Sequence, residues 1–166
     1  MFVARTPSAV GGSMGSEPQE QPKHGILIVD DEPVLVEEIG EFLLADGFPV
    51  SHAFDGRSAL EVFRQAPAGH FAVVLTDLRM PGMTGYALAR TIMESTTGAT
   101  ATEVIVITGH GSPFTQAEAP DGLFAVVQKP VRLAKLAEIV GQAHDAALVR
   151  RLAASAGTVS GHSNEA

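Results

Sequence analysis

The sequence predicts an α/β domain in which five parallel strands form one sheet with helices on both of its faces. Short apolar segments rich in β-branched residues alternate with longer segments whose apolar residues recur at helical spacing. Five such alternations are typical of a parallel sheet, because each crossover between parallel strands brings a covering helix. Several apolar segments also end in polar or charged residues, and ligands bind outside the carboxyl ends of such strands.

An acidic turn separates the first predicted strand from the first predicted helix. The apolar segment 25–29, GILIV, is followed directly by Asp30 and Asp31. Pro33 then suits the first turn of a helix, where a missing backbone N–H costs little. This helix is predicted to end at Gly47. Its inner face is predicted from apolar residues at helical spacing: Val34, Leu35, Ile39, Phe42 and Leu43.

The second strand is predicted over residues 48–53, and its shorter, mixed sequence suits the edge of the sheet. A helix follows over about residues 56–65. Its predicted inner residues are Ala59, Leu60 and Phe63. The third strand, residues 71–76, is an unbroken apolar segment and is therefore expected to be buried on both faces.

The loop after the third strand begins at Asp77 and has the most distinctive sequence in the chain. Residues 80–85, MPGMTG, can continue neither a strand nor a helix, because Pro81 lacks a backbone donor and both glycines favour irregular backbone. Asp77 is therefore expected at the lip of a rigid loop. As a single residue, it is equally compatible with simply capping a turn.

The second half of the chain continues the alternation with one weak element. A helix over residues 86–94 is followed by a strand over 104–107, VIVI, which leads into Thr108 and Gly109. Residues 112–122 contain two prolines and few apolar residues. The fourth helix is therefore predicted to be short or irregular.

The fifth strand, over residues 123–127, leads to Lys129 and to a final helix that starts at Val131. The inner stripe of this helix is predicted to contain Leu133, Leu136, Val140, Ala143 and Ala147. Leu148 and Leu152 lie beyond the length needed to cover the sheet. This extension either pairs with a partner or a second copy of the chain, or frays.

The length of 166 residues suits one domain with tails. Residues 1–23 are rich in Gly, Ser, Pro and Gln and are predicted to form a disordered tail. The folded domain is expected over residues 24–152. Residues 153–166 are predicted to form a second disordered tail, which is too short and too polar for an output domain, so the domain is expected to stand alone.

Composition narrows the classes of function. The chain carries 11 Lys and Arg against 19 Asp and Glu, a net charge of −8, which argues against a direct nucleic-acid surface. The absence of cysteine excludes disulfides, thiolate catalysis and the common zinc sites. Neither a signal peptide nor an apolar run of about 18 residues is present. A cytoplasmic location without membrane contact is expected.

Polar residues at the ends of four strands are predicted to converge. Right-handed crossovers leave few topologies, and the order 2-1-3-4-5 places Asp30 and Asp31 beside Asp77. Three carboxylates in one crevice need a cation, and Mg²⁺ suits carboxylates, waters and a phosphate oxygen. Lys129 and Thr108 would add a mobile cation and a hydroxyl donor. Each residue alone also has an ordinary structural role, but their joint placement favours a site.

These motifs resemble the receiver domains of two-component response regulators. The resemblance rests on the acid pair Asp30-Asp31, on Asp77 in D-x-x-M-P-x-M-x-G, and on Thr108-Gly109 and Lys129-Pro130, each after an apolar strand. It covers about residues 25–147. It implies a flavodoxin-like receiver fold, and the strand order 2-1-3-4-5 is taken from this family.

The resemblance implies that Asp77 accepts a phosphoryl group from a phosphohistidine on a sensor histidine kinase or a histidine phosphotransfer protein. Lys129 and Thr108 would neutralise charge on the phosphoryl oxygens, as such a transfer requires. The domain would catalyse only its own phosphorylation and dephosphorylation, so it is not expected to be an enzyme in the usual sense. Its phosphorylated state would change binding to an effector protein.

The resemblance also implies a metal site. Mg²⁺ would be held by Asp31, by the Asp77 carboxylate and by the backbone carbonyl of Arg79, with Asp30 assisting through water. Arg79 and His110 occupy positions that tune the lifetime of the phosphoryl group in this family. As a single residue, His110 is more often a solvent-facing loop histidine than a ligand.

The sequence departs from the family pattern near the fifth strand. The usual aromatic residue three positions before the lysine is replaced by Val126, and Phe124 is expected on the same face of the strand. The coupling between the threonine and this aromatic position is therefore in question. The structural response to phosphorylation is expected within residues 109–122.

Three other functions remain open at this level. The domain could be a phosphate sink or relay intermediate without its own effector. A flavodoxin-type binder is disfavoured, because the acidic turn Asp30-Asp31 would repel a cofactor phosphate. A hydrolase with an aspartyl nucleophile would normally need a larger cap or substrate pocket.

Overall fold

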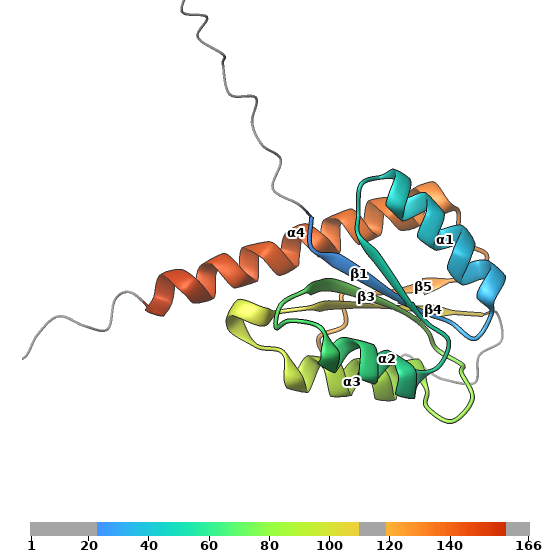
Figure 1. Cartoon of the computed structure of the whole chain (residues 1–166), viewed down its shortest axis with the longest axis horizontal. Helices are drawn as coiled ribbons and strands as arrows, with labels where there is room; N and C mark the ends of the chain where they lie inside the picture. The colour runs from blue at the N-terminus through green and yellow to red at the C-terminus, as the bar shows by residue number, and fades with distance from the viewer. Residues whose placement is uncertain (1–22, 110–118, 159–166) are drawn as a thin grey trace, which may run out of the picture.

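The computed structural model describes residues 23–109 and 119–158 of the chain. Five parallel strands form one sheet in the order β2-β1-β3-β4-β5, which confirms the predicted topology (Figure 1). The strands are β1 (Gly25–Val29), β2 (Val50–Ala53), β3 (Phe71–Asp77), β4 (Glu103–Thr108) and β5 (Ala125–Gln128).

The helices cover both faces of the sheet, with α1 and α4 on one face and α2 and α3 on the other (Figure 1). Their bounds are α1 (Pro33–Ala45), α2 (Gly56–Gln65), α3 (Gly85–Ser95) and α4 (Leu133–Thr158), and a short 3-10 helix, η1, covers Gly98–Thr100. None of the described helices is long and apolar enough to cross a membrane.

The central strands divide the core into two layers. In β1, Ile26 and Ile28 face α1 and α4, whereas Leu27 and Val29 face α2 and α3. This alternation follows from the period of two in a strand. Every residue of β3 is buried, as its unbroken apolar sequence predicted. Burial on both faces holds the carboxyl ends of β1 and β3 in fixed positions.

The inner face of α1 differs from the prediction. Val34 is 77% exposed and Phe42 is 38% exposed, and the buried positions are Val36, Ile39, Gly40 and Leu43. A Cβ atom at Gly40 would lie 2.6 Å from Nε2 of His52. Gly40 therefore belongs to the buried face of α1. A prediction based only on apolar side chains could not identify this position. Val34 is left on the surface of the first turn.

The final helix is longer than predicted. It continues to Thr158, whereas residues 153–166 had been assigned to a tail. The added turn is rich in alanine, the strongest helix former, and Ser155 Oγ donates a hydrogen bond of 3.0 Å to the carbonyl of Arg151.

Several predictions concern residues outside the described ranges. They include most of the irregular fourth helix, predicted over residues 112–122, and His110. Residues 119–122 are described and form no helix. Most of both predicted tails, residues 1–22 and 159–166, also lies outside these ranges, so the predicted domain boundaries remain predictions.

Candidate functional site

Two buried carboxylates lie at the carboxyl ends of the neighbouring strands β1 and β3. Asp30 is 3% exposed and Asp77 is 7% exposed. Each uses one oxygen to accept a backbone N–H two residues ahead, Asp30 from Glu32 at 2.9 Å and Asp77 from Arg79. Such turns orient the side chain. The second oxygen of each carboxylate remains directed at a common partner.

That partner is Lys129, which follows β5. Its Nζ atom lies 2.8 Å from Oδ1 of Asp77, 3.0 Å from Oδ2 of Asp30 and 3.7 Å from Oε1 of Glu32. The backbone N–H of Lys129 donates to the carbonyl of Thr108 at 2.7 Å and so ties the residue to the end of β4. Residues that follow or end β1, β3 and β5 thus place the ammonium group of Lys129 between the carboxylates of Asp30 and Asp77.

The electrostatics of this cluster depend on burial and on the central lysine. Burial raises the pKa of Asp30 above its ordinary value, and hydrogen bonds from the Glu32 N–H and from Lys129 offset this only in part. Burial alone would lower the pKa of Lys129, but hydrogen bonds to Asp77 and Asp30 outweigh it and the pKa is raised. Lys129 is therefore charged at neutral pH. With both carboxylates ionised, these three groups together retain one negative charge.

The loop after Asp77 is held by close backbone packing. The N–H of Leu78 donates to the carbonyl of Ile107 at 2.8 Å, and the N–H of Gly85 donates to the carbonyl of Leu78 at 2.9 Å. A Cβ atom at Gly85 would lie 2.2 Å from the carbonyl oxygen of Asp77. Only glycine permits this approach. The last residue of the MPGMTG segment thus fixes the backbone of the central aspartate.

The remaining predicted residues lie around this cluster. Asp31 is exposed and lies outside the ion pairs that the described residues form with Lys129. Thr108 is half-buried, and its hydroxyl donates to the carbonyl of Gly109 at 3.4 Å. A Cβ atom at Gly109 would lie 3.3 Å from Nη2 of Arg79, so this guanidinium reaches across from the β3 loop to the β4 loop. The geometry brings Asp30, Asp77 and Lys129 into contact.

The family model of the response regulator receiver domain matches residues 26–141 of the chain. The chain belongs to this family. This receiver domain is 35% identical over 112 residues to the transcriptional regulatory protein GlrR of Escherichia coli (strain K12), covering 67% of this chain and 24% of that protein. It is also 35% identical over 114 residues to the response regulator receiver protein Anae109_2439 of Anaeromyxobacter sp. (strain Fw109-5), covering 68% and 45% of the two chains.

Solved structures agree with the fold. A response regulator receiver domain protein from Clostridium thermocellum matches with a TM-score of 0.68 and 29% identity, over 76% of this chain and 98% of the other. A CheY-like receiver domain protein from Methanospirillum hungatei JF-1 matches with a TM-score of 0.67 and 25% identity, over 75% and 96%. By contrast, the chain spans a quarter to about a half of the length of the curated relatives named above.

The receiver's hard oxygen donors fit Mg²⁺ in chemistry. Within residues 23–109 and 119–158, however, no group of three histidine or acidic side chains is arranged to hold a metal ion. In the described cluster, Lys129 lies between Asp30 and Asp77, and Asp31 is exposed.

Val126 and Phe124 do not share a face of the sheet as expected. Val126 is 43% exposed, whereas Phe124 is partly buried against the core beneath α1 and α4, together with Ala125 and Val127. Phe124 precedes β5, so the period of two within the strand does not extend to it. The residue at the usual aromatic position is thus an exposed valine.

A groove beside Lys129 was not predicted. It has a volume of about 390 Å³ and lies between α1 and the connection from β5 to α4. Val34, Glu38, Lys129, Pro130 and Val131 are among its lining residues. We call it the α1 groove. Assigning Val34 to the core concealed this feature in the sequence.

Proposed function

We propose that this receiver domain accepts a phosphoryl group on Asp77 from a phosphohistidine of a sensor histidine kinase or a histidine phosphotransfer protein. The observation that carries the proposal is the position of Lys129, 2.8 Å from Asp77 and 3.0 Å from Asp30. A positive charge held beside Asp77 would offset the negative charge that develops on a transferring phosphoryl group. Such preorganised charge is the main contribution a protein makes to phosphoryl transfer.

In the transfer, an oxygen of the Asp77 carboxylate forms a bond to phosphorus as the bond from phosphorus to the donor histidine nitrogen breaks. Lys129 then shifts its contact from Asp77 to the phosphoryl oxygens, while Asp30 keeps the ammonium group close. The Thr108 hydroxyl, which now donates to a backbone carbonyl at 3.4 Å, is free to turn toward the phosphoryl group because that bond is long.

Asp31, the Asp77 carboxylate and the backbone carbonyl of Arg79 would hold Mg²⁺, with Asp30 assisting through water. The metal would supply further neutralisation of phosphoryl oxygen charge. The net negative charge of the described cluster supports this assignment, because one lysine does not balance the carboxylates at this edge.

The α1 groove is the proposed docking surface for the phosphoryl donor. Val34 offers an exposed apolar contact within it, and Lys129 both lines the groove and contacts Asp77. A donor seated there would present its histidine to the acceptor. The output is proposed to be altered binding of an effector protein, which relatives named as transcriptional regulatory proteins also suggest.

A phosphate sink or relay intermediate is the second candidate. It is favoured by the exposed valine at position 126, where receivers usually carry an aromatic residue that responds to the threonine. A short phosphoryl lifetime together with no partner bound in a state-dependent way would support the sink.

The proposal is tested by incubating the full chain with a radiolabelled histidine kinase and Mg²⁺. Label should appear on the wild type in an acid-stable, alkali-labile form, and it should be absent from Asp77→Asn. The Thr76→Ser variant, altered one residue earlier within β3, is the matched control and should retain labelling. Equal labelling of Asp77→Asn would rule out Asp77 as the acceptor.

A further inference from the structure

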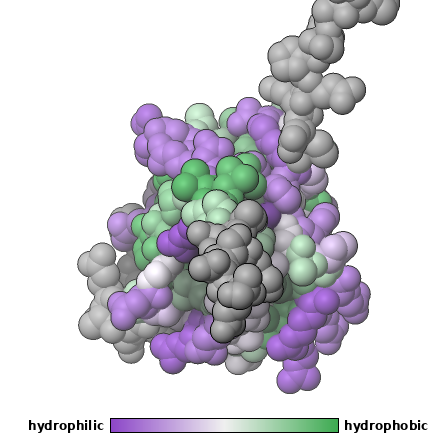
Figure 2. Space-filling view, turned by 90° about the vertical axis from the view of Figure 1, so that its left-hand side faces the viewer, coloured by the Kyte–Doolittle hydropathy of each residue, from purple (hydrophilic) through white to green (hydrophobic). Residues whose placement is uncertain are grey.

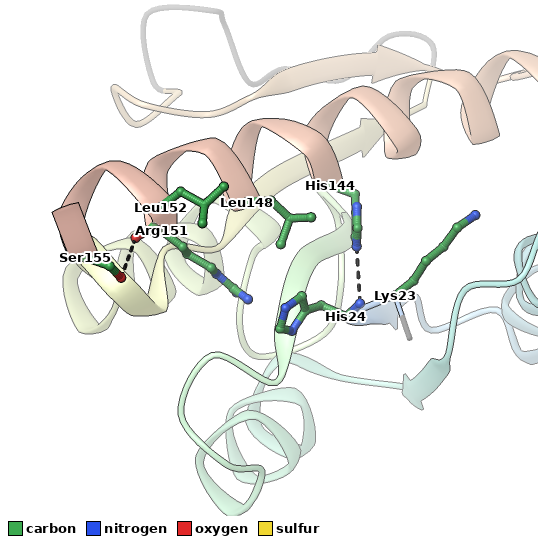
Figure 3. Close-up of a pocket in the computed structure, with 7 residues that line it drawn as sticks. All are labelled: Lys23, His24, His144, Leu148, Arg151, Leu152 and Ser155. Atoms are coloured by element: carbon green, nitrogen blue, oxygen red, sulfur yellow. Dashed lines mark hydrogen bonds between the residues drawn. The ribbon is translucent and has the colours of Figure 1, made fainter. Parts of the chain in front are cut away.

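A second cavity lies at the amino edge of the sheet, opposite the carboxylate cluster. It has a volume of about 290 Å³ and is formed by the start of β1 and the last turns of α4 (Figure 3). We call it the amino-edge pocket. Arg151 and His144 reach from α4 toward His24, with Leu148 between them (Figure 3). The side chains that line this pocket are mainly basic or apolar, although the chain as a whole carries a net charge of −8.

Arg151 is a buried guanidinium in this pocket, and it is only 8% exposed. It donates three hydrogen bonds of 2.8 Å to backbone carbonyls, from Nε to Ala101, from Nη1 to Gly69 and from Nη2 to Phe71. A guanidinium carries five N–H groups, so two remain. Within the described ranges no carboxylate forms an ion pair with Arg151, and none lines the pocket. A buried cation with only neutral partners favours an incoming anion.

The positive charge of Arg151 is the dominant charge in the pocket, as the surroundings of the other polar groups show. The backbone N–H of His24 donates to Nε2 of His144 at 3.2 Å, so this ring nitrogen is already used as an acceptor. Burial, followed by the charge of Arg151, lowers the pKa of His24. Lys23 points away from the pocket centre, and its Nζ atom donates to the carbonyl of Asp46 at 2.7 Å (Figure 3).

An apolar wall completes the pocket. Leu148 and Leu152 lie on successive turns of α4, and Leu152 is 71% exposed. Figure 2 faces the side of the molecule where α4 ends and shows a hydrophobic patch among mostly hydrophilic side chains. A ligand with an apolar chain could cover part of this wall while its charged end reaches Arg151.

We propose that the amino-edge pocket binds a small monocarboxylate that carries a short apolar chain. A carboxylate suits Arg151 because hydrogen bonds between a guanidinium and a carboxylate are charge-assisted. The chain would lie against Leu148 and Leu152. A polyanion is disfavoured by the net negative charge of the protein, and the volume is too small for a nucleotide. This site is distinct from the proposed phosphoacceptor, which lies at the other edge of the sheet.

The test is a titration of the isotopically labelled full chain with hexanoate in phosphate-free buffer at neutral pH, followed by NMR. Saturable shifts are expected for the amides of His24 and Leu148, whereas Asp77 should not shift. The neutral probe 1-hexanol should bind about tenfold more weakly, because it lacks the charge-assisted hydrogen bonds to Arg151.

Two variants of exposed positions on α4 make the test specific. Leu152→Glu places a carboxylate beside the pocket and should weaken hexanoate binding by about tenfold through charge repulsion. Val149→Glu is the matched control, since Val149 is 65% exposed and does not line the pocket. Its affinity should stay within about twofold of the wild type. No saturable shift, equal binding of 1-hexanol, or equal affinities of the two variants would overturn the proposal.

Discussion

Lys129 is the residue on which the carboxylate cluster depends. Replacing it with methionine leaves Asp30 and Asp77 as neighbouring buried carboxylates with no ammonium between them. We expect Lys129→Met to lose about 1–3 kcal/mol of unfolding free energy at neutral pH, a cost discounted for the partial exposure of the lysine. The loss is measured by urea denaturation.

The same variant probes the proposed metal site without requiring phosphorylation. Added Mg²⁺ should stabilise Lys129→Met more than the wild type, because the metal then replaces the missing charge. The matched control is Lys135→Met, an exposed lysine of α4 paired with Glu138, which should respond to Mg²⁺ as the wild type does. If Mg²⁺ left the stability of Lys129→Met unchanged, the carboxylates could not be metal ligands in the way proposed.

Glu103 is a second buried charge, far from the cluster along the sheet. Its side chain is only 2% exposed, and Oε1 lies 3.2 Å from Nε of Arg150 without forming an aligned hydrogen bond. Burial raises its pKa, and the charge of Arg150 opposes this only in part. The ordinary pKa of a glutamate is 4.5. In a pH interval above this value, Glu103 is therefore still protonated in the folded state but already ionised in the unfolded state.

Stability should accordingly fall as pH rises through that interval and stay lower above it. Glu103→Gln removes this loss, so we expect the variant to be more stable than the wild type at pH 7 and to vary less with pH above 4.5. Thermal unfolding at several pH values measures both effects. Asp145→Asn, at a carboxylate that is 82% exposed, serves as the control and should change little. A less stable Glu103→Gln would mean that the ion pair with Arg150 outweighs the cost of burial.

At the scale of elements, α4 shows how a helix end that extends past a sheet remains ordered. Figure 1 shows α4 crossing the face of the sheet and projecting beyond it. Its last turns are tied to the amino edge by Arg151, which binds the carbonyls of Gly69, Phe71 and Ala101. The sequence offered two outcomes for this extension, pairing or fraying, and neither included an arginine bound to backbone carbonyls.

We therefore expect Arg151→Met to cost about 2–4 kcal/mol of unfolding free energy, because buried carbonyls lose charged donors. Arg90→Met, at an exposed arginine of α3, should cost less than about 1 kcal/mol. Urea denaturation of both variants compares them directly. Equal losses would show that Arg151 contributes no more than a surface arginine.

For the whole molecule, short-range patterns in the sequence predicted the alternation of strands and helices, and the family resemblance supplied the strand order. Apolar strands followed by Asp30, Asp77 and Lys129 place those residues at one edge of a parallel sheet, whatever the details of packing. The α1 groove was missed for the opposite reason. The groove depends on which apolar residues of α1 face inward. In the structure Gly40 packs closely against His52, and the spacing of apolar residues does not reveal this contact.

The charge state of the site could not be predicted either. Strand ends specify that carboxylates and a lysine are near one another, but not which carboxylate oxygens the lysine contacts. Distances near 3 Å decide such questions, and they come from the tertiary arrangement of three separate strands. The predicted roles of Asp31, Arg79 and Thr108 remain proposals for this reason, and the expected response of residues 109–122 falls mainly outside the described ranges.

The cluster connects β1, β3 and β5, so occupying it should stabilise the molecule as a whole. Beryllofluoride with Mg²⁺ should mimic the phosphoryl group proposed for Asp77 and bind only the folded state. A ligand present at about 100 times its dissociation constant adds about 2.7 kcal/mol to the unfolding free energy. For a domain of this size we expect the melting temperature to rise by about 5 °C or more.

Differential scanning calorimetry should show this rise in the wild type and not in Asp77→Asn. Because Asp77→Asn leaves Asp30 and Lys129 in place, an equal rise in that variant would show that the mimic acts elsewhere on the protein and that β3 does not carry the acceptor.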